Sequence, residues 1–257
     1  MMAGTPILVD SVQGVTSLLV ELHSIPSSPS LAIAPSIYCD LEGVNLGRQG
    51  SLSILTLYVP QVQKVYLVDV FTLKQAAFST ECDGRSLKTI LEDNSVGKAF
   101  FDIRNDSDAL YSHFGLSVAG IHDLQLMELA TRPWPASNRY ISGLSRCIER
   151  DLAAVSTLKV DWLRIKQAGE QLWSPEKGGR YEVFNERPLR PEIIKYCAQD
   201  VTLLPQLWEL YKKRLGDASS VWRARIHRET EERIKLSQST NYNGKGKHMA
   251  VAPASFQ

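Results

Sequence analysis

The sequence has few cysteines and histidines, and their spacing excludes several common kinds of site. The four cysteines (Cys39, Cys82, Cys147 and Cys197) form no C-x-x-C pair, and no histidine stands at zinc-finger spacing from them. A structural zinc site is therefore not expected. Single, separated cysteines are typical of reduced thiols in an intracellular protein. The sequence also lacks a G-x-S-x-G motif and an evident Ser-His-Asp set, which argues against a hydrolase with a protein nucleophile.

Long apolar runs are missing as well. No segment approaches the roughly 18 consecutive apolar residues that a membrane-spanning helix needs. The N-terminal residues MMAGTPILVDS lack the basic stretch and the apolar run of a secretory signal. We therefore expect no membrane partner and an intracellular location, either cytoplasmic or nuclear.

The chain as a whole has almost no net charge, but the charges are distributed unevenly along it. The formal net charge is +1, yet the segment from Lys212 onward carries ten Lys and Arg against four Asp and Glu, and the remainder is slightly acidic. A basic end beside an acidic body is found in proteins that meet a polyanion through one surface, and equally in proteins with an ordinary charged tail.

The residue pattern predicts an α/β fold in which strands dominate the first part and helices the second. Two strongly β-prone segments, 51–59 and 64–70, are joined by a short linker and predict an antiparallel hairpin. The other expected strands are residues 7–9, 37–41, 97–101 and 118–122. Later strands alternate with helices, which favours three layers around a mixed sheet.

The C-terminal part predicts helices followed by a polar tail. Pro191 suits the first turn of a helix that runs to about Tyr211, and Pro205 should kink or break it. We expect a folded domain over residues 1–216, a charged helix over 217–236 and a disordered tail over 237–257.

Acidic residues at the end of an apolar strand give the first indication of function. Asp40 and Glu42 follow apolar residues at a spacing of two, which places both carboxylates on one face of a strand. Two like charges at this place cost free energy unless a cation neutralises them. The pair therefore predicts a metal site that further carboxylates should complete.

Two later segments offer those carboxylates. Asp102, Asp106 and Asp108 lie where an apolar strand ends and a helix begins, while Tyr196 and Asp200 are four residues apart on a helix and share a face. Taken singly, each has an ordinary interpretation as a helix cap, a solvated charge or a half-buried tyrosine. Hard cations such as Mg²⁺ prefer such oxygen ligands, so the order of the three segments is what favours a two-metal site.

In this order the motifs resemble the DEDDy group of 3′→5′ exonucleases, to which ribonuclease D belongs. The segments DLEGVNLGRQGSLSILTL, KAFFDIRNDSDALYSHFG and RPLRPEIIKYCAQDVTLL carry the resemblance, which covers roughly residues 7–215. It implies a ribonuclease H-like fold, with a mixed sheet of five or six strands flanked by helices on both faces.

The resemblance also implies roles for individual residues. The first aspartate bridges two Mg²⁺ or Mn²⁺ ions, the glutamate holds one of them, the two later aspartates complete the ligand set, and the tyrosine positions the attacking water. Counting back from Phe114 favours Asp106 over Asp102 as the second-motif aspartate. The catalytic residues implied are Asp40, Glu42, Asp106, Tyr196 and Asp200.

The implied reaction is hydrolysis of the terminal phosphodiester at the 3′ end of a single-stranded nucleic acid. RNA is favoured over DNA by analogy alone. Leu41, Gly43 and Val44 are expected beside the terminal nucleotide, and Arg104 at a phosphate. Two alternatives stay open: a catalytically weak or inactive RNA-binding scaffold of the same fold, and an unrelated α/β domain whose acids do not converge. The sequence leaves the natural substrate, processivity and oligomeric state undetermined.

Overall fold

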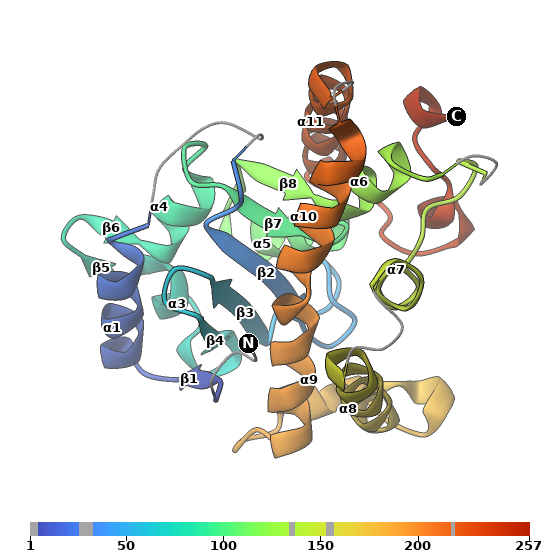
Figure 1. Ribbon diagram of the computed structural model, residues 1–257. Helices are drawn as coiled ribbons and strands as arrows, with labels where there is room; N and C mark the ends of the chain where they lie inside the picture. Colours follow the sequence, from blue (N-terminus) through green and yellow to red (C-terminus); the bar gives the residue numbers. More distant parts are fainter. Residues whose placement is uncertain (1–4, 26–32, 134–136, 153–156, 217–218) are drawn as a thin grey trace.

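A six-stranded mixed sheet forms the centre of the computed structural model, which describes residues 5–25, 33–133, 137–152, 157–216 and 219–257 (Figure 1). The strand order is β1-β4-β3-β2-β7-β8. β3 runs antiparallel to both of its neighbours, and the remaining pairs are parallel. The strands are β1 (Ile7–Val9), β2 (Ile37–Glu42), β3 (Ile54–Val59), β4 (Lys64–Asp69), β7 (Lys98–Phe100) and β8 (Ile121–Asp123). The expected mixed sheet and the β3–β4 hairpin are confirmed.

Helices cover both faces of the sheet, as expected (Figure 1). One apolar core lies between the sheet and α1 (Val12–Leu22), α3 (Ala76–Ser79) and α4 (Leu87–Glu92). A second core on the opposite face includes residues of α6 (Leu124–Ala130), α8 (Thr157–Trp173), α9 (Pro191–Thr202) and α10 (Leu204–Leu215). The elements α2 (Val70–Leu73), α5 (Arg104–Phe114), α7 (Leu144–Asp151) and α11 (Ser219–Ser237) complete the set of helices.

Strand β2 separates the two cores because its side chains alternate between the faces. Ile37, Cys39 and Leu41 belong to the core under α1, whereas Tyr38 belongs to the core under α9. Asp40 and Glu42 continue the Tyr38 side of the alternation and therefore point toward α9.

Local signals set the helix boundaries. The Ser11 hydroxyl accepts a hydrogen bond at the start of α1, and Gly115 ends α5 with a left-handed φ of 60°. Pro205 lies in the first turn of α10, so the long helix expected over residues 191–211 is divided at Leu203. No helix in the described part of the chain has the combination of length and apolar content needed to cross a bilayer.

Two details differ from the sequence-based expectation. The sequence of residues 72–79 predicts a single helix, but the segment is split into α2 and α3, since Lys74 adopts a φ of 52° between them. A small hairpin of β5 (Glu81–Cys82) and β6 (Arg85–Ser86) was not anticipated, although its turn is formed by Asp83-Gly84, a dipeptide typical of tight hairpins.

The expected disorder of residues 237–257 is wrong, because this segment folds back onto the domain. It contains the 3-10 helices η4 (Lys247–Ala250) and η5 (Ala254–Phe256). Tyr242 donates a hydrogen bond to Asn105 at 2.8 Å, and the Phe256 ring lies 5.7 Å from that of Trp222. The buried residues are spaced irregularly among polar ones, so the segment has no periodicity that would have revealed its packing.

Candidate active site

Three carboxylates from distant parts of the chain converge at one end of β2. The ligand oxygens of Asp40, Glu42 and Asp200 all lie within 4.8 Å of one another. Asp40 and Glu42 point from β2 toward α9, which supplies Asp200. The prediction that the first and third acidic segments meet in space is therefore confirmed, and the alternative of coincidental, scattered acids is excluded for these three residues.

Because these three acids are buried close together, ionising them costs free energy and their pKa values are raised. Burial, followed by the negative charge of Asp200, raises the pKa of Asp40 to about 7. Burial and the charges of Asp40 and Asp200 likewise raise the pKa of Glu42 well above its ordinary value. The pKa of Asp200 is also raised, chiefly by burial. Like charges held this close are expected where a cation neutralises them.

The donor set fits a hard divalent cation. All three ligands are carboxylates, which Mg²⁺ and Mn²⁺ prefer. Asp200 is 4% exposed, and within the described residues its Oδ1 atom has no hydrogen-bond partner. A buried carboxylate oxygen without a hydrogen-bond partner is unusual. Binding of a metal ion would give this oxygen a partner. The structure therefore contains a candidate metal site.

Tyr196 and Lys166 border this group of acids. Tyr196 lies one helical turn before Asp200 on α9 and is 4% exposed. The ammonium of Lys166, from α8, donates a hydrogen bond to the Tyr196 hydroxyl at 3.0 Å and another to Asp200 Oδ2 at 2.6 Å. Sequence reasoning missed Lys166, although it shares a helix face with the apolar residue Trp162, and a lysine on such a face is a usable signal.

The Tyr196 ring is held from several sides by apolar groups. Its centroid lies 5.9 Å from that of Trp173 and 6.4 Å from that of Phe184. It also lies against the backbone of α8 at Gly169, where an added Cβ atom would be 2.4 Å from the tyrosine Cδ2 atom. This packing fixes the direction in which the hydroxyl points.

The structure favours Asp106 over Asp102 as the fourth acid. Asp106 lies outside the 4.8 Å group, but burial and the charge of Asp40 raise its pKa well above the ordinary value. Asp102 is instead neutralised by Arg104, with an Nε–Oδ1 distance of 2.6 Å, and by Arg233. Burial tends to raise the pKa of Asp102, but these two arginines lower it overall. Among the described residues, Asp106 is thus the acid near Asp40 that has no such ion pair with an arginine.

The side chains expected to contact substrate do not gather around the acids. Leu41 is 3% exposed and lies in the core on the opposite face of β2, so it does not wedge against a terminal base. Arg104 is 8% exposed and donates to Asp102 and to the carbonyl of Met249, which argues against the expected phosphate contact.

The other two expected substrate residues form a backbone turn beside the site. Gly43 packs so tightly that an added Cβ atom would lie 1.9 Å from the carbonyl oxygen of Ser51. Val44 accepts a hydrogen bond from the Ser51 backbone and is partly buried. Both residues therefore shape the chain that follows Glu42, and their contact with a nucleotide stays a prediction.

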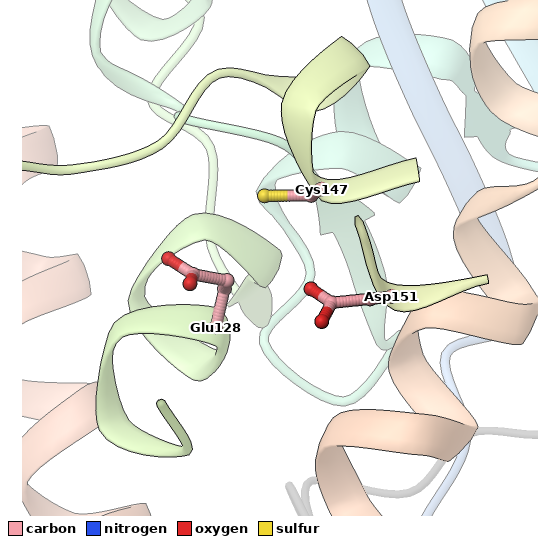
Figure 2. Close-up of side chains that lie close together, drawn as sticks. All are labelled: Glu128, Cys147 and Asp151. Atoms are coloured by element: carbon pink, nitrogen blue, oxygen red, sulfur yellow. The ribbon is translucent and has the colours of Figure 1, made fainter. Parts of the chain in front are cut away.

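A second acidic group, Glu128, Cys147 and Asp151, has its ligand atoms within 4.8 Å and points into one space between α6 and α7 (Figure 2). Its charge is already balanced by arginines: Arg132 and Arg150 contact Glu128, and Arg150 and Arg214 contact Asp151. Burial raises the pKa of Cys147 to about 12, which keeps the thiol protonated. We interpret this group as an ion-pair network that joins α6, α7 and α10.

Comparison with known proteins assigns the chain to a family. A family model described as a 3′-5′ exonuclease matches residues 26–215. The chain belongs to the 3′-5′ exonuclease family. The acids on β2 and α9 lie within the matched segment, and the resemblance to ribonuclease D-like members of the DEDDy group is confirmed.

Relatives and solved structures agree with this family. The chain is 29% identical over 187 residues to the mouse (Mus musculus) piRNA biogenesis protein EXD1, a match that covers 70% of this chain and 30% of that protein. It thus spans about a third of the length of the curated relatives it matches. RNase D of Trypanosoma brucei, in complex with RNA U12, superposes with a TM-score of 0.71 at 20% identity, over 99% of this chain and 79% of that one. RNase D of Escherichia coli superposes with a TM-score of 0.60 at 18% identity, over 92% and 52%. These two likenesses confirm the ribonuclease H-like fold.

Proposed function

We propose that this protein is a metal-dependent 3′→5′ exonuclease that hydrolyses the terminal phosphodiester bond of a single-stranded nucleic acid. The observation that carries the proposal is the convergence of Asp40, Glu42 and Asp200 beside Tyr196. Among the described residues, these three carboxylates have too few cations around them to form an ion-pair network like that of Glu128 and Asp151. Its chemistry suits the binding of cations and, through them, of a phosphate.

The acids would hold two Mg²⁺ or Mn²⁺ ions, with Asp40, Glu42, Asp106 and Asp200 as ligands. Bound there, such ions supply charge neutralisation at the scissile phosphate and lower the pKa of a nearby water. Tyr196 keeps its proton, because burial and the charges of Glu42 and Asp200 raise its pKa well above the ordinary value. We infer that its hydroxyl orients the attacking water through a hydrogen bond.

RNA is the proposed substrate class, with the 3′ end of a single strand as the reacting part. The support is the RNA-bound Trypanosoma brucei structure and the role in piRNA biogenesis named for EXD1, and both belong to those proteins. We propose that residues 1–216 carry the activity in an intracellular compartment, cytoplasmic or nuclear. The thiols Cys39, Cys82, Cys147 and Cys197 are all free, in keeping with a reducing compartment.

A catalytically weak or inactive RNA-binding scaffold is the second candidate. One observation favours it: the Lys166 ammonium already neutralises part of the acidic group through its ion pair with Asp200. A cation of the protein itself in this place would weaken metal binding if it could not yield to the ions. The intact set of four acids and Tyr196 favours the enzyme.

A 3′-end ladder assay decides between the two candidates. The protein is incubated with 5′-labelled single-stranded RNA or DNA of one sequence, in Mg²⁺, Mn²⁺ or EDTA. We expect stepwise shortening of RNA that requires the metal and falls at least ~1000-fold in Asp200→Asn, since a buried ligand and its charge are lost. Asp161→Asn, a matched change at an exposed position of α8, should keep full activity. Binding without shortening of either substrate would favour the scaffold.

A further inference from the structure

Lys166 is a buried lysine that contacts both a candidate metal ligand and the candidate water-positioning tyrosine. Its side chain is 13% exposed and that of Asp200 is 5% exposed. Lysine is seldom buried unless it is paired, and here it stands between α8 and α9. Its Nζ atom also lies 4.4 Å from the centroid of the Tyr196 ring, which is a cation–π distance.

The chemistry of an ammonium group fixes the direction of both hydrogen bonds. Lysine has three donors and no acceptor, so the Tyr196 oxygen and Asp200 Oδ2 must accept from it. The Tyr196 hydroxyl therefore has its own proton left to donate, either to Asp200, whose pKa it helps to lower, or to a water. Asp200 is left with Oδ1 as the oxygen that has no partner among the described residues.

Gly169, one turn after Lys166 on α8, leaves room for the Tyr196 side chain. The Tyr196 side chain occupies the space of a side chain at position 169, since an added Cβ atom would lie within 2.7 Å of its Cδ2, Cγ and Cβ atoms. α8 thus provides both a cation for the tyrosine hydroxyl and an open backbone for the tyrosine ring.

We propose that Lys166 is a positioning residue of this site, which turns Asp200 Oδ1 toward the metal and the Tyr196 hydroxyl proton toward the attacking water. The inference rests on the proposed exonuclease function and adds to it a residue outside the four acids and the tyrosine. In this role Lys166 stays on Oδ2 and leaves Oδ1 as the oxygen of Asp200 that would hold a metal ion. The ammonium also lies close enough to the acids to weaken cation binding by repulsion.

Two measurements on the whole chain test the proposal. The first is calorimetric titration of Mn²⁺ without nucleic acid, and the second is the rate of 3′ shortening at saturating Mn²⁺. The variants are Lys166→Met, which keeps the length of the side chain, Lys166→Arg, which keeps a donor cation, and Lys177→Met as a matched change at an exposed lysine.

A positioning role predicts opposite effects on binding and rate. Lys166→Met should bind Mn²⁺ several-fold more tightly, since a positive charge is removed, yet its kcat should fall at least ~10-fold with little change in KM. Lys166→Arg should return the Mn²⁺ affinity to near that of the wild type and restore part of kcat. Lys177→Met should match the wild type in both.

Three results would overturn the proposal. Unchanged Mn²⁺ affinity in Lys166→Met would show that Lys166 lies outside the metal site. Unchanged kcat would show that it orients nothing, and a higher kcat would show that it only competes with the metal. If the wild type shortens neither RNA nor DNA, the proposed function fails, while the Mn²⁺ affinities still show whether Lys166 borders the metal site.

Discussion

At the scale of single residues, Asp40 gives the metal-free protein a distinctive pH dependence. Its pKa in the folded protein is about 7, against an ordinary value of 3.8 for an aspartate. The folded state therefore binds a proton that the unfolded chain releases as the pH rises from about 4 to about 7, so the free energy of unfolding falls across this window. We expect a loss of about 2 kcal/mol, less than the full shift would give because Asp40 keeps some contact with solvent and is coupled to its neighbours. Urea unfolding in EDTA at several pH values measures it.

The source of this pH dependence can be isolated with one substitution. Asp40→Asn removes the titrating group and relieves the repulsion on Glu42 and Asp200, so the variant should be more stable than the wild type at pH 7.5 in EDTA and lose less stability across the window. Added Mg²⁺ should stabilise the wild type and not the variant. Equal pH profiles for the two proteins, with Asp161→Asn as the charge-matched control, would rule out Asp40 as the titrating group.

At the scale of elements, the contact between α8 and α9 places the tyrosine, and Gly169 is the point of closest approach. In an exposed helix interior, alanine is more stable than glycine by roughly 0.5–1 kcal/mol. Here the Cβ atom would meet the Tyr196 ring at 2.4 Å, so one helix must shift. We expect Gly169→Ala to lower stability by about 1–3 kcal/mol and kcat at least ~10-fold, as measured by thermal unfolding and the ladder assay.

A second glycine provides the control for this substitution. Gly143 precedes α7 with an ordinary φ of −75°, and a Cβ atom there would meet nothing within 4 Å in the described structure. Gly143→Ala should therefore leave kcat near that of the wild type and lower stability by at most about 1 kcal/mol, because Gly143 is the N-cap of α7, where glycine is more favourable than alanine. A Gly169→Ala protein that is more stable and fully active would mean that helix propensity outweighs the packing of Tyr196.

The elements also show where sequence reasoning reaches its limit. Asp40, Glu42 and the Tyr196–Asp200 pair could be predicted because a strand repeats every two residues and a helix every three to four, so their spacing fixes their faces. Lys166 shares a helix face with Trp162, which is a local signal of burial, but its role and that of Gly169 depend on how α8 lies against α9, and the local sequence does not encode that contact. The position of Leu41 follows from the two-residue repeat of the strand. Leu41 lies between Asp40 and Glu42 on β2, so its side chain points to the opposite core, away from both acids.

At the scale of the whole molecule, the last helix and the segment after it close one side of the domain. α11 packs against α5, α6 and β8, and its Arg233 donates to Asp123 at 2.7 Å. Residues 238–257 then reach α5 through Tyr242 and Asn105, and the Met249 carbonyl accepts from Arg104. Both contacts lie directly before Asp106, so the end of this chain supports the turn that presents the fourth acid.

Removal of residues 238–257 tests this arrangement. Phe256 is 4% exposed beside Trp222, and burying a phenylalanine stabilises a protein by about 1.5–3 kcal/mol. We expect the shortened chain to lose about 2–4 kcal/mol of unfolding free energy in urea, and Phe256→Ala alone to lose about half of that. Tight Mn²⁺ binding by Asp40, Glu42 and Asp200 should persist, because those ligands lie on β2 and α9. If the shortened chain were as stable as the full one, residues 238–257 would contribute nothing to the stability of the fold. The disorder predicted from their polar, aperiodic sequence would then be correct.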